Sequence, residues 1–311
     1  MLYQLSYTPA GAAASIGPRR RTQAPIRPAC RPILPNAPFH ARNAGVHPLG
    51  KIIDPQLLML AYRSGIFPMA DGREDPEVFW VEPRLRAILP LDGFRLSRSL
   101  ARTLRRGRFS VSCNAAFDAV MAGCAAPRAE SEETWISGRI AASYRALHQA
   151  GFAHSIECWQ TGTDGEPRLV GGLYGVGFDR VFCGESMFST VPDASKVALA
   201  WLVAALRRGG AELLDCQFMT DHLASLGAIE MPQARYLTLL KQAQRPYSGT
   251  AAGDGEDAGD AEGAGDAGAD EADGAVLALP AAFAALLADA KAAGSSSSPG
   301  NFIAQSLTQT S

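Results

Sequence analysis

Three polar residues in the second half of the chain combine side-chain types and positions suited to chemistry. Asp215 stands near the end of the stretch 211–216, which we expect to be a buried strand, and Gln217 follows two residues later. If the strand continues, both side chains point to the same side of the sheet. Glu185 lies in the string GESMFS, and a carboxylate in such apolar surroundings needs a partner. An acid–amide pair and a second acid are therefore the candidate reactive groups.

A second group of residues is suited to contacts with nucleic acid. The stretch 84–108 carries eight arginines against one acid, which makes it the strongest phosphate-binding candidate in the chain. Trp135 follows a charged loop at 128–133, where an indole is placed to stack on a base. The arginines that we expect to contact phosphates are Arg84, Arg98, Arg102, Arg105 and Arg106.

The elements that must position these residues alternate between helices and strands. Capping and stop signals predict a helix through 57–63, after the start signal Asp54-Pro55, and helices at 97–107, 115–124, 138–150, 194–208 and 232–244. Strands are predicted at 109–113, 154–161, 169–176, 181–184 and 211–216. Asp193 is the expected cap of the helix at 194–208. This alternation, with some strands in hairpins, predicts a mixed-sheet α/β or α+β fold.

Composition separates a folded middle from two flanking segments. Residues 1–50 hold six arginines, many prolines and no acid, which predicts a disordered tail; a transit peptide or a start codon assigned too early are alternatives. Residues 249–274 alternate Gly, Ala, Asp and Glu as a solvated acidic linker, and 280–291 can form one short helix. The expected divisions are an Arg/Pro-rich tail, a small N-terminal domain, a catalytic domain and an acidic tail at 1–50, 51–91, 92–246 and 247–311.

Several classes of protein are excluded or disfavoured. No apolar run reaches the roughly 18 to 20 residues that a membrane-spanning helix needs. The six cysteines form no CxxC pair, which argues against a zinc ribbon or a disulfide-stapled scaffold and favours reduced thiols. The glycines at 171–177 do not form a GxGxxG loop that opens a helix, so dinucleotide binding is disfavoured.

Four short motifs, in their order and spacing, carry a family resemblance. They are GIFP at 65–68, TWI at 134–136, GGLYGV with FCGESMFS at 171–189, and LDCQ with SLGA at 214–228. Over about residues 51–245 the chain resembles the leucyl/phenylalanyl-tRNA–protein transferases. The resemblance implies a catalytic domain with the fold of the acyl-CoA N-acyltransferases, a smaller domain before it, and no need for a metal or bound cofactor.

The resemblance also implies an activity. Leu, Phe or Met moves from an aminoacyl-tRNA to the N-terminal Arg or Lys of an acceptor protein, which marks that protein for N-end rule proteolysis. The enzyme is then expected to be a cytoplasmic monomer without membrane contacts. An aminoacyl ester is already activated, so the enzyme has to align an amine with the ester carbonyl, remove a proton and stabilise an oxyanion. Because a free N-terminal amine has a pKa of roughly 8, a nearby carboxylate need supply only modest help.

Individual roles follow from the same resemblance. Gln217 contacts the attacking amine, Asp215 is its electrostatic or proton-accepting partner, and the identity of the direct base stays open. Glu185 contacts the amino group of the transferred residue or the tRNA end, and Trp135 contacts the tRNA end. The expected pocket for the transferred side chain, with core packing as the alternative for each residue, is Leu173, Phe182, Met187, Leu199, Leu202 and Leu214. Replacing Asp215 or Gln217 with Ala is expected to abolish transfer and preserve folding.

Two other functions stay open at this point. An N-acyltransferase that uses a soluble thioester would share the expected fold, although no pyrophosphate-binding loop is evident before a helix. A non-enzymatic RNA-binding module would account for the arginine cluster at 84–108. Transfer from acyl-CoA without tRNA would favour the first, and binding of charged tRNA without product would favour the second.

Overall fold

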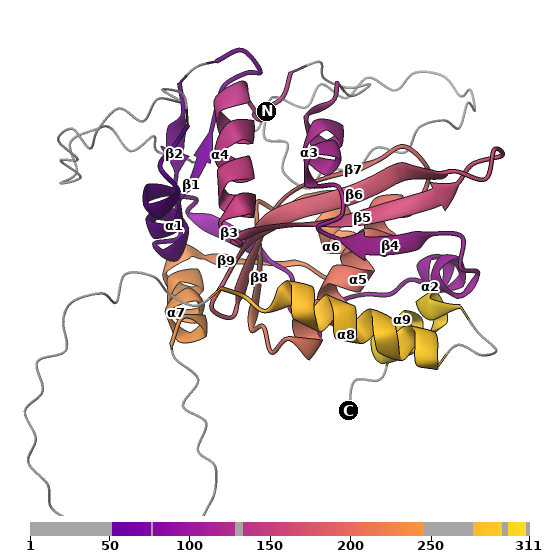
Figure 1. The fold of residues 1–311 in the computed structure, drawn as a ribbon. Helices are drawn as coiled ribbons and strands as arrows, with labels where there is room; N and C mark the ends of the chain where they lie inside the picture. The colour runs from indigo at the N-terminus through magenta and orange to yellow at the C-terminus, as the bar shows by residue number, and fades with distance from the viewer. Residues whose placement is uncertain (1–51, 76, 128–132, 246–275, 294–297, 309–311) are drawn as a thin grey trace, which may run out of the picture.

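The computed structural model describes residues 52–75, 77–127, 133–245, 276–293 and 298–308. Its centre is a seven-stranded sheet in the order β4-β5-β6-β7-β8-β3-β9 (Figure 1). Neighbouring strands are antiparallel except β7 and β8, which are parallel. The strands are β3 (Leu85–Ile88), β4 (Ser110–Cys113), β5 (Ala153–Thr161), β6 (Pro167–Phe178), β7 (Val181–Ser189), β8 (Leu213–Gln217) and β9 (Ile229–Pro232). The predicted mixed-sheet α/β fold is confirmed.

Helices cover both faces of this sheet (Figure 1). The first face, called the α1 face here, packs against α1 (Pro55–Arg63), α3 (Phe117–Ala125), α4 (Gly138–Gln149) and α7 (Gln233–Ala243). The opposite face, called the α5 face, packs against α2 (Arg98–Arg105), α5 (Ala194–Arg208), α6 (Asp221–Ser225), α8 (Leu279–Ala292) and α9 (Pro299–Ser306). A small antiparallel pair, β1 (Phe67–Met69) and β2 (Phe79–Val81), belongs with the α1 face.

The alternation of side chains along each strand divides the core between the two faces. In β8, Leu213 enters the apolar cluster of the α1 face and Leu214 enters that of the α5 face. Every residue of β8 is buried. This is why its apolar residues Leu213, Leu214 and Cys216 occupy both sides of the strand rather than one. Residues at odd and even positions of β8 therefore serve different faces.

Most predicted helices form where their capping residues indicate. The Asp54 carboxylate accepts bonds from the backbone N–H groups of Gln56 and Leu57 and starts α1. Helix α5 has the predicted bounds, but the predicted cap at its start is wrong. Asp193 has a left-handed backbone (φ 71°) and makes no capping bond. Its carboxylate accepts a bond from the Thr103 hydroxyl instead, at 3.2 Å.

Four short strands were not predicted. β1, β2, β3 and β9 span only three or four residues each, and the pairing partners of β3 and β9 are distant in sequence. Such segments have too few residues for a periodic signal. β3 lies between β8 and β9 in the main sheet, so the sheet takes strands from both sides of the domain boundary expected at residue 91.

The C-terminal segment is more structured than its acidic composition suggested. The helix expected at 280–291 is α8, and a second helix, α9, follows it. Phe283 of α8 packs on Trp201 of α5, with ring centroids 5.6 Å apart. A Cβ on Gly300 of α9 would stand 2.2 Å from the Leu104 carbonyl oxygen, so glycine permits close contact with α2. Both helices are therefore part of the α5-face core.

Other expectations concern residues beyond these elements. The predictions for 1–50 and 249–274 fall on residues that the structure does not describe. None of the helices in the described ranges has the length and apolarity to cross a bilayer. The described cysteines, at 113, 124, 158, 183 and 216, are free thiols.

Candidate active site

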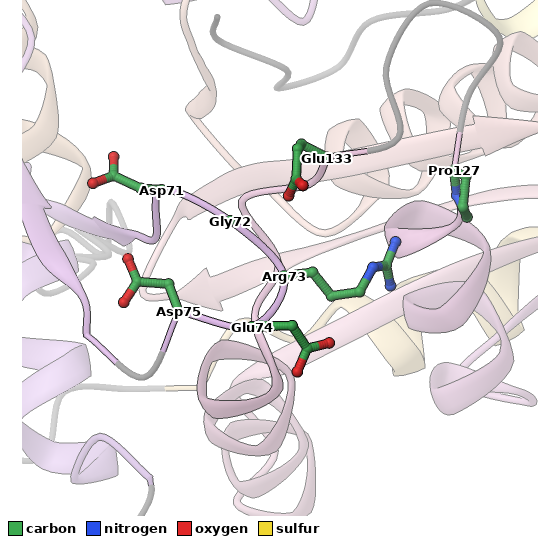
Figure 2. Close-up of a pocket in the computed structure, with 7 residues that line it drawn as sticks. All are labelled: Asp71, Gly72, Arg73, Glu74, Asp75, Pro127 and Glu133. Atoms are coloured by element: carbon green, nitrogen blue, oxygen red, sulfur yellow. The ribbon is translucent and has the colours of Figure 1, made fainter.

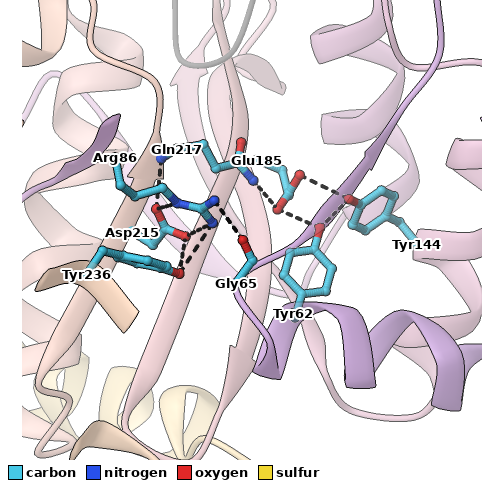
Figure 3. A network of polar contacts seen from close by, with 8 residues as sticks. All are labelled: Tyr62, Gly65, Arg86, Tyr144, Glu185, Asp215, Gln217 and Tyr236. Atoms are coloured by element: carbon cyan, nitrogen blue, oxygen red, sulfur yellow. Dashed lines mark hydrogen bonds and ion pairs between the residues drawn. The ribbon is translucent and has the colours of Figure 1, made fainter. Parts of the chain in front are cut away.

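The parallel strands β7 and β8 set the position of the site. Their pairing covers three residue pairs and ends at Cys183 and Asp215. Two residues farther along each strand, the side chains of Glu185 and Gln217 meet, and Gln217 Nε2 donates to Glu185 Oε1 at 2.9 Å (Figure 3). A side-chain bond thus links the strands beyond the end of their backbone pairing.

Glu185 lies on the α1 face, where regular alternation from Val181 and Cys183 places it, and an irregularity in β7 at this residue shifts the alternation that follows. In the pairing with β6, Tyr174 lies opposite Ser186 and Gly175 lies opposite Gly184, which leaves Glu185 as an extra residue. Such a bulge changes the direction of a side chain relative to the regular pleat. A Cβ on Gly175 would stand 2.3 Å from the Cys183 carbonyl oxygen, so the close approach of the strands here requires glycine.

Glu185 is completely buried and accepts three hydrogen bonds. Tyr62 of α1 donates to Oε1 at 2.7 Å, beside the bond from Gln217, and Tyr144 of α4 donates to Oε2 at 3.0 Å. The hydroxyls of Tyr62 and Tyr144 also contact each other. Burial raises the pKa of Glu185 to about 7, although the two tyrosine hydroxyls act in the opposite direction. Glu185 can therefore change its protonation state near neutral pH.

Asp215 lies in a second network and has no free oxygen. Arg86 donates from Nε to Oδ1 at 2.8 Å and from Nη2 to Oδ2 at 2.5 Å. Tyr236 donates to Oδ2 at 2.9 Å, and the backbone N–H of Gln217 donates to Oδ1 at 2.8 Å. Because each oxygen already accepts two bonds, this carboxylate is a rigid anchor for the Gln217 backbone.

Arg86 is as buried as the acid that it binds. Its side chain is 2% exposed, and its Nη1 donates to the Gly65 carbonyl at 3.0 Å. The guanidinium carbon lies 4.8 Å from the centroid of the Phe67 ring and 4.5 Å from that of Tyr236. Burial is the largest single influence and lowers the pKa of Arg86, but Asp215, Tyr236 and Cys183 together raise it, so the net shift is upward. The GIFP motif thus supplies contacts that hold a buried cation.

Gln217 is held in an unusual conformation and carries an unsatisfied acceptor. Its backbone is left-handed (φ 64°), a conformation that costs a non-glycine residue free energy and that often occurs at functional sites. Its Oε1 is buried and has no hydrogen-bond partner in the structure. Leaving such an acceptor unsatisfied costs roughly 1–3 kcal/mol. The Ser186 hydroxyl on β7 and the Tyr174 hydroxyl on β6 are buried and have no hydrogen-bond partner in the structure either.

The six residues expected to form the side-chain pocket all lie on the other face of the sheet. They belong to the α5-face core, and none is more than 2% exposed. They are Leu173, Phe182, Met187, Leu199, Leu202 and Leu214. Trp135 lies on the α1 face and is 5% exposed. The structure therefore places the expected pocket and the polar networks on opposite sides of β7 and β8.

The five arginines expected to contact phosphates are exposed. In α2, Leu100, Ala101 and Leu104 face the core while Arg98, Arg102 and Arg105 face solvent. Arg84 and Arg106 are exposed outside this helix. Arg86 is one of the eight arginines counted at 84–108. Its assignment to the phosphate-binding stretch is wrong, because Arg86 is buried against Asp215.

Sequence reasoning missed four members of the networks. Tyr62, Tyr144 and Tyr236 lie on the buried sides of amphipathic helices, where tyrosine is commonly a core residue. Arg86 stands directly before the apolar residues 87–89, which is the one local signal that it enters the core. Their partners are 41 or more residues away in most cases, so spacing could not reveal the contacts.

Two surface cavities lie away from these networks. The one in Figure 2 is lined by residues 71–75, Pro127 and Glu133. The other lies between β3, α5 and α7 and includes Ile88, Arg207 and Leu239. Neither contains Glu185, Asp215 or Gln217.

Comparison with known proteins gives a consistent result. The family model "Leucyl/phenylalanyl-tRNA protein transferase" matches residues 88–241, and the model of its N-terminal domain matches residues 52–84. A leucyl/phenylalanyl-tRNA–protein transferase of Novosphingobium aromaticivorans is 67% identical over 83% of this chain and 97% of its own length. One of Rhizorhabdus wittichii is 57% identical over 66% of this chain and 81% of its own. The solved structure of L-PGS from Bacillus licheniformis covers 54% of each chain at 13% identity, with a TM-score of 0.28, too low to support an argument.

Proposed function

The chain belongs to the leucyl/phenylalanyl-tRNA–protein transferase family, and from this premise we propose how its site performs the transfer. It is an aminoacyltransferase of the N-end rule, with an aminoacyl-tRNA as donor and a protein as acceptor. We propose that the transferred residue is Leu, Phe or Met and that the acceptor begins with Arg or Lys. We also propose that the enzyme acts as a monomer in the cytoplasm, where charged tRNA is made.

The observation that carries the mechanism is the unsatisfied Oε1 of Gln217. Glu185 fixes the direction of the amide because an ionised carboxylate accepts only from its NH2 group. Asp215 fixes the backbone of the same residue. The oxygen is therefore presented to a donor that the protein does not supply. The α-amine of the acceptor is a donor of the required kind, and Gln217 would align its lone pair with the ester carbonyl.

The reaction exchanges one bond for another. The amine nitrogen forms a bond to the ester carbon, the bond from that carbon to the ribose oxygen breaks, and the proton lost by nitrogen ends on that oxygen. Asp215 supports this step by holding Gln217 in its left-handed conformation. Because all its acceptor positions are used, we assign it the positioning role and not the proton-accepting one.

The transferred side chain requires space on the α5 face. We propose that it enters between β7 and β8 beyond Cys183 and Asp215, where the strands have no backbone pairing to break. Phe182 and Leu214 flank this point on the α5 face, and Met187 lies farther along β7. These side chains are packed together in the structure, so binding would require them to move apart.

The tRNA would lie along the exposed side of α2. Arg98, Arg102 and Arg105 form its solvent-facing side, and Arg84 and Arg106 are also exposed. Backbone phosphates are the ligand expected for arginines that have no buried partner acid. We propose in addition that Trp135 contacts the tRNA end.

The test uses purified protein, radiolabelled leucyl-tRNA and a peptide that begins with Arg, with and without ribonuclease. We expect product from the wild type only while the tRNA is intact, and a loss of at least ~100-fold in Gln217→Ala. Gln233→Ala is the matched control, because Gln233 also donates to a carboxylate, that of Glu82, but lies outside the networks. Wild-type rates in Gln217→Ala would refute the proposed mechanism, and transfer from acyl-CoA without tRNA would favour the thioester alternative.

A further inference from the structure

We propose that Glu185 takes the proton from the attacking amine and that Tyr62 and Tyr144 are positioning residues that fix its carboxylate and keep it ionised before that step. The inference deepens the proposed function and rests on Gln217 as the residue that binds the amine. It answers which group is the direct base, a question that the sequence leaves open.

The number of protons shared by Glu185, Tyr62 and Tyr144 is consistent with Glu185 as the base. Glu185, Tyr62 and Tyr144 form a closed triangle in which each group contacts the other two. An ionised Glu185 leaves two hydroxyl protons for these three contacts. One more proton, on the carboxyl group, gives each contact a proton of its own. The triangle can therefore take up one proton without losing any of its three contacts.

The side chain of Gln217 can bind the attacking amine with one atom of its amide and Glu185 with another. Its Nε2 bonds to Glu185, and its Oε1, on the same carbon, is the acceptor without a partner. An amine bound to the lone pair of that oxygen nearer Nε2 would lie on the side of the amide next to Glu185. Asp215 is beside the backbone of Gln217 and would have to give up a bond from Arg86 or Tyr236 to take a proton. Geometry thus favours Glu185.

The electrostatic environment of Glu185 gives it a pKa that suits a base. Among the described groups that affect the pKa of Glu185, Arg86 is the one cation, and this arginine is bound to Asp215. Burial, the largest influence, raises the pKa of Glu185 to about 7, the two tyrosines lower it, and Asp215 raises it. A base with a pKa near the working pH suits an amine whose own pKa is roughly 8. The ionisable groups facing Glu185 are Tyr62 from α1, Tyr144 from α4, Tyr174 from β6, Arg86 from β3, Asp215 from β8 and Cys183 from its own strand.

The proton and bond changes balance in this scheme. As the C–N bond forms, the nitrogen of the attacking amine becomes positively charged and gives its proton to Glu185. As the ester C–O bond breaks, Glu185 returns the proton to the ribose oxygen. The enzyme ends each cycle in its starting state, and no additional reactant is needed.

The experiment measures single-turnover transfer against pH at saturating peptide. For the wild type we expect the rate to rise with pH through a midpoint near 7. Tyr62→Phe and Tyr144→Phe each remove a bond that lowers the pKa of Glu185, so each midpoint should move upward, by roughly one pH unit. Glu185→Gln should lose ~100-fold or more of the rate. Tyr236→Phe is the matched control: it removes a hydroxyl bond to Asp215, so its rate can fall but its midpoint should stay.

A direct titration distinguishes chemistry from folding. The infrared band of the protonated carboxyl that is present in the wild type and absent in Glu185→Gln should appear as the pH falls through about 7. Unchanged midpoints in both Tyr→Phe variants, or a Glu185→Gln variant as fast as the wild type, would overturn the inference. In either case an inactive Gln217→Ala would leave the proposed role of Gln217 standing. A fully active Gln217→Ala would refute that role, and the absence of product from the wild type would refute the proposed function.

Discussion

Both faces of the seven-stranded sheet bury an apolar cluster, but they differ in the charged side chains that are buried with it. The α5 face is an apolar core made of leucines, alanines and aromatic rings from α2, α5, α8 and α9. The α1 face buries Glu185, Asp215 and Arg86 among tyrosines and gives each a partner. Apolar contacts are many and individually weak, so the α5 face can lose one at moderate cost. The buried charges of the α1 face stabilise one another, so removing one of them leaves its partner buried and unpaired.

The first way to break this comparison is Asp215→Ala, for which we expect the largest effect. It would leave Arg86 buried without its counter-ion, at a cost of about 3–5 kcal/mol. This is a large part of the ~5–15 kcal/mol by which a typical domain is stable, so the sequence-based expectation of preserved folding needs revision. Urea denaturation measures the loss. A stability within ~0.5 kcal/mol of the wild type would show that the pair is not an essential unit.

The second is Leu202→Ala on the α5 face, where we expect a smaller and more variable loss of about 2–5 kcal/mol. The same substitution tests whether Leu202 also lines the proposed pocket. If it does, the enlarged space should change the preference between phenylalanyl- and leucyl-tRNA, measured as the ratio of the two kcat/KM values. Leu286→Ala in α8, in the same core, is the control that should alter stability alone. Equal changes of the ratio in both variants would count against the pocket.

How much of this contrast the sequence could predict depends on where each partner lies. The bounds of α5 were predicted correctly because a helix is determined by neighbours three or four residues away. The importance of Asp215, Gln217 and Glu185 came from motifs in short stretches. The bond from Arg86 to Asp215 joins residues 129 positions apart, and that from Tyr62 to Glu185 joins residues 123 apart. No local pattern encodes such contacts, so the arginine was assigned to the basic surface.

That basic surface provides the smallest expected effect on stability and the sharpest contrast with Arg86. Arg102 is exposed on α2, so Arg102→Gln should change the free energy of unfolding by no more than ~0.5 kcal/mol. If it contacts a phosphate, the slope of log affinity for tRNA against log salt concentration should fall by about 1. Arg168→Gln is the matched control, since Arg168 is exposed at the start of β6 and paired with Asp164. Two arginines from one basic stretch would then differ completely: Arg86 would govern folding, and Arg102 would govern the salt dependence of tRNA binding. Equal slopes for Arg102→Gln and the wild type would remove Arg102 from the tRNA interface while leaving the comparison of the two faces intact.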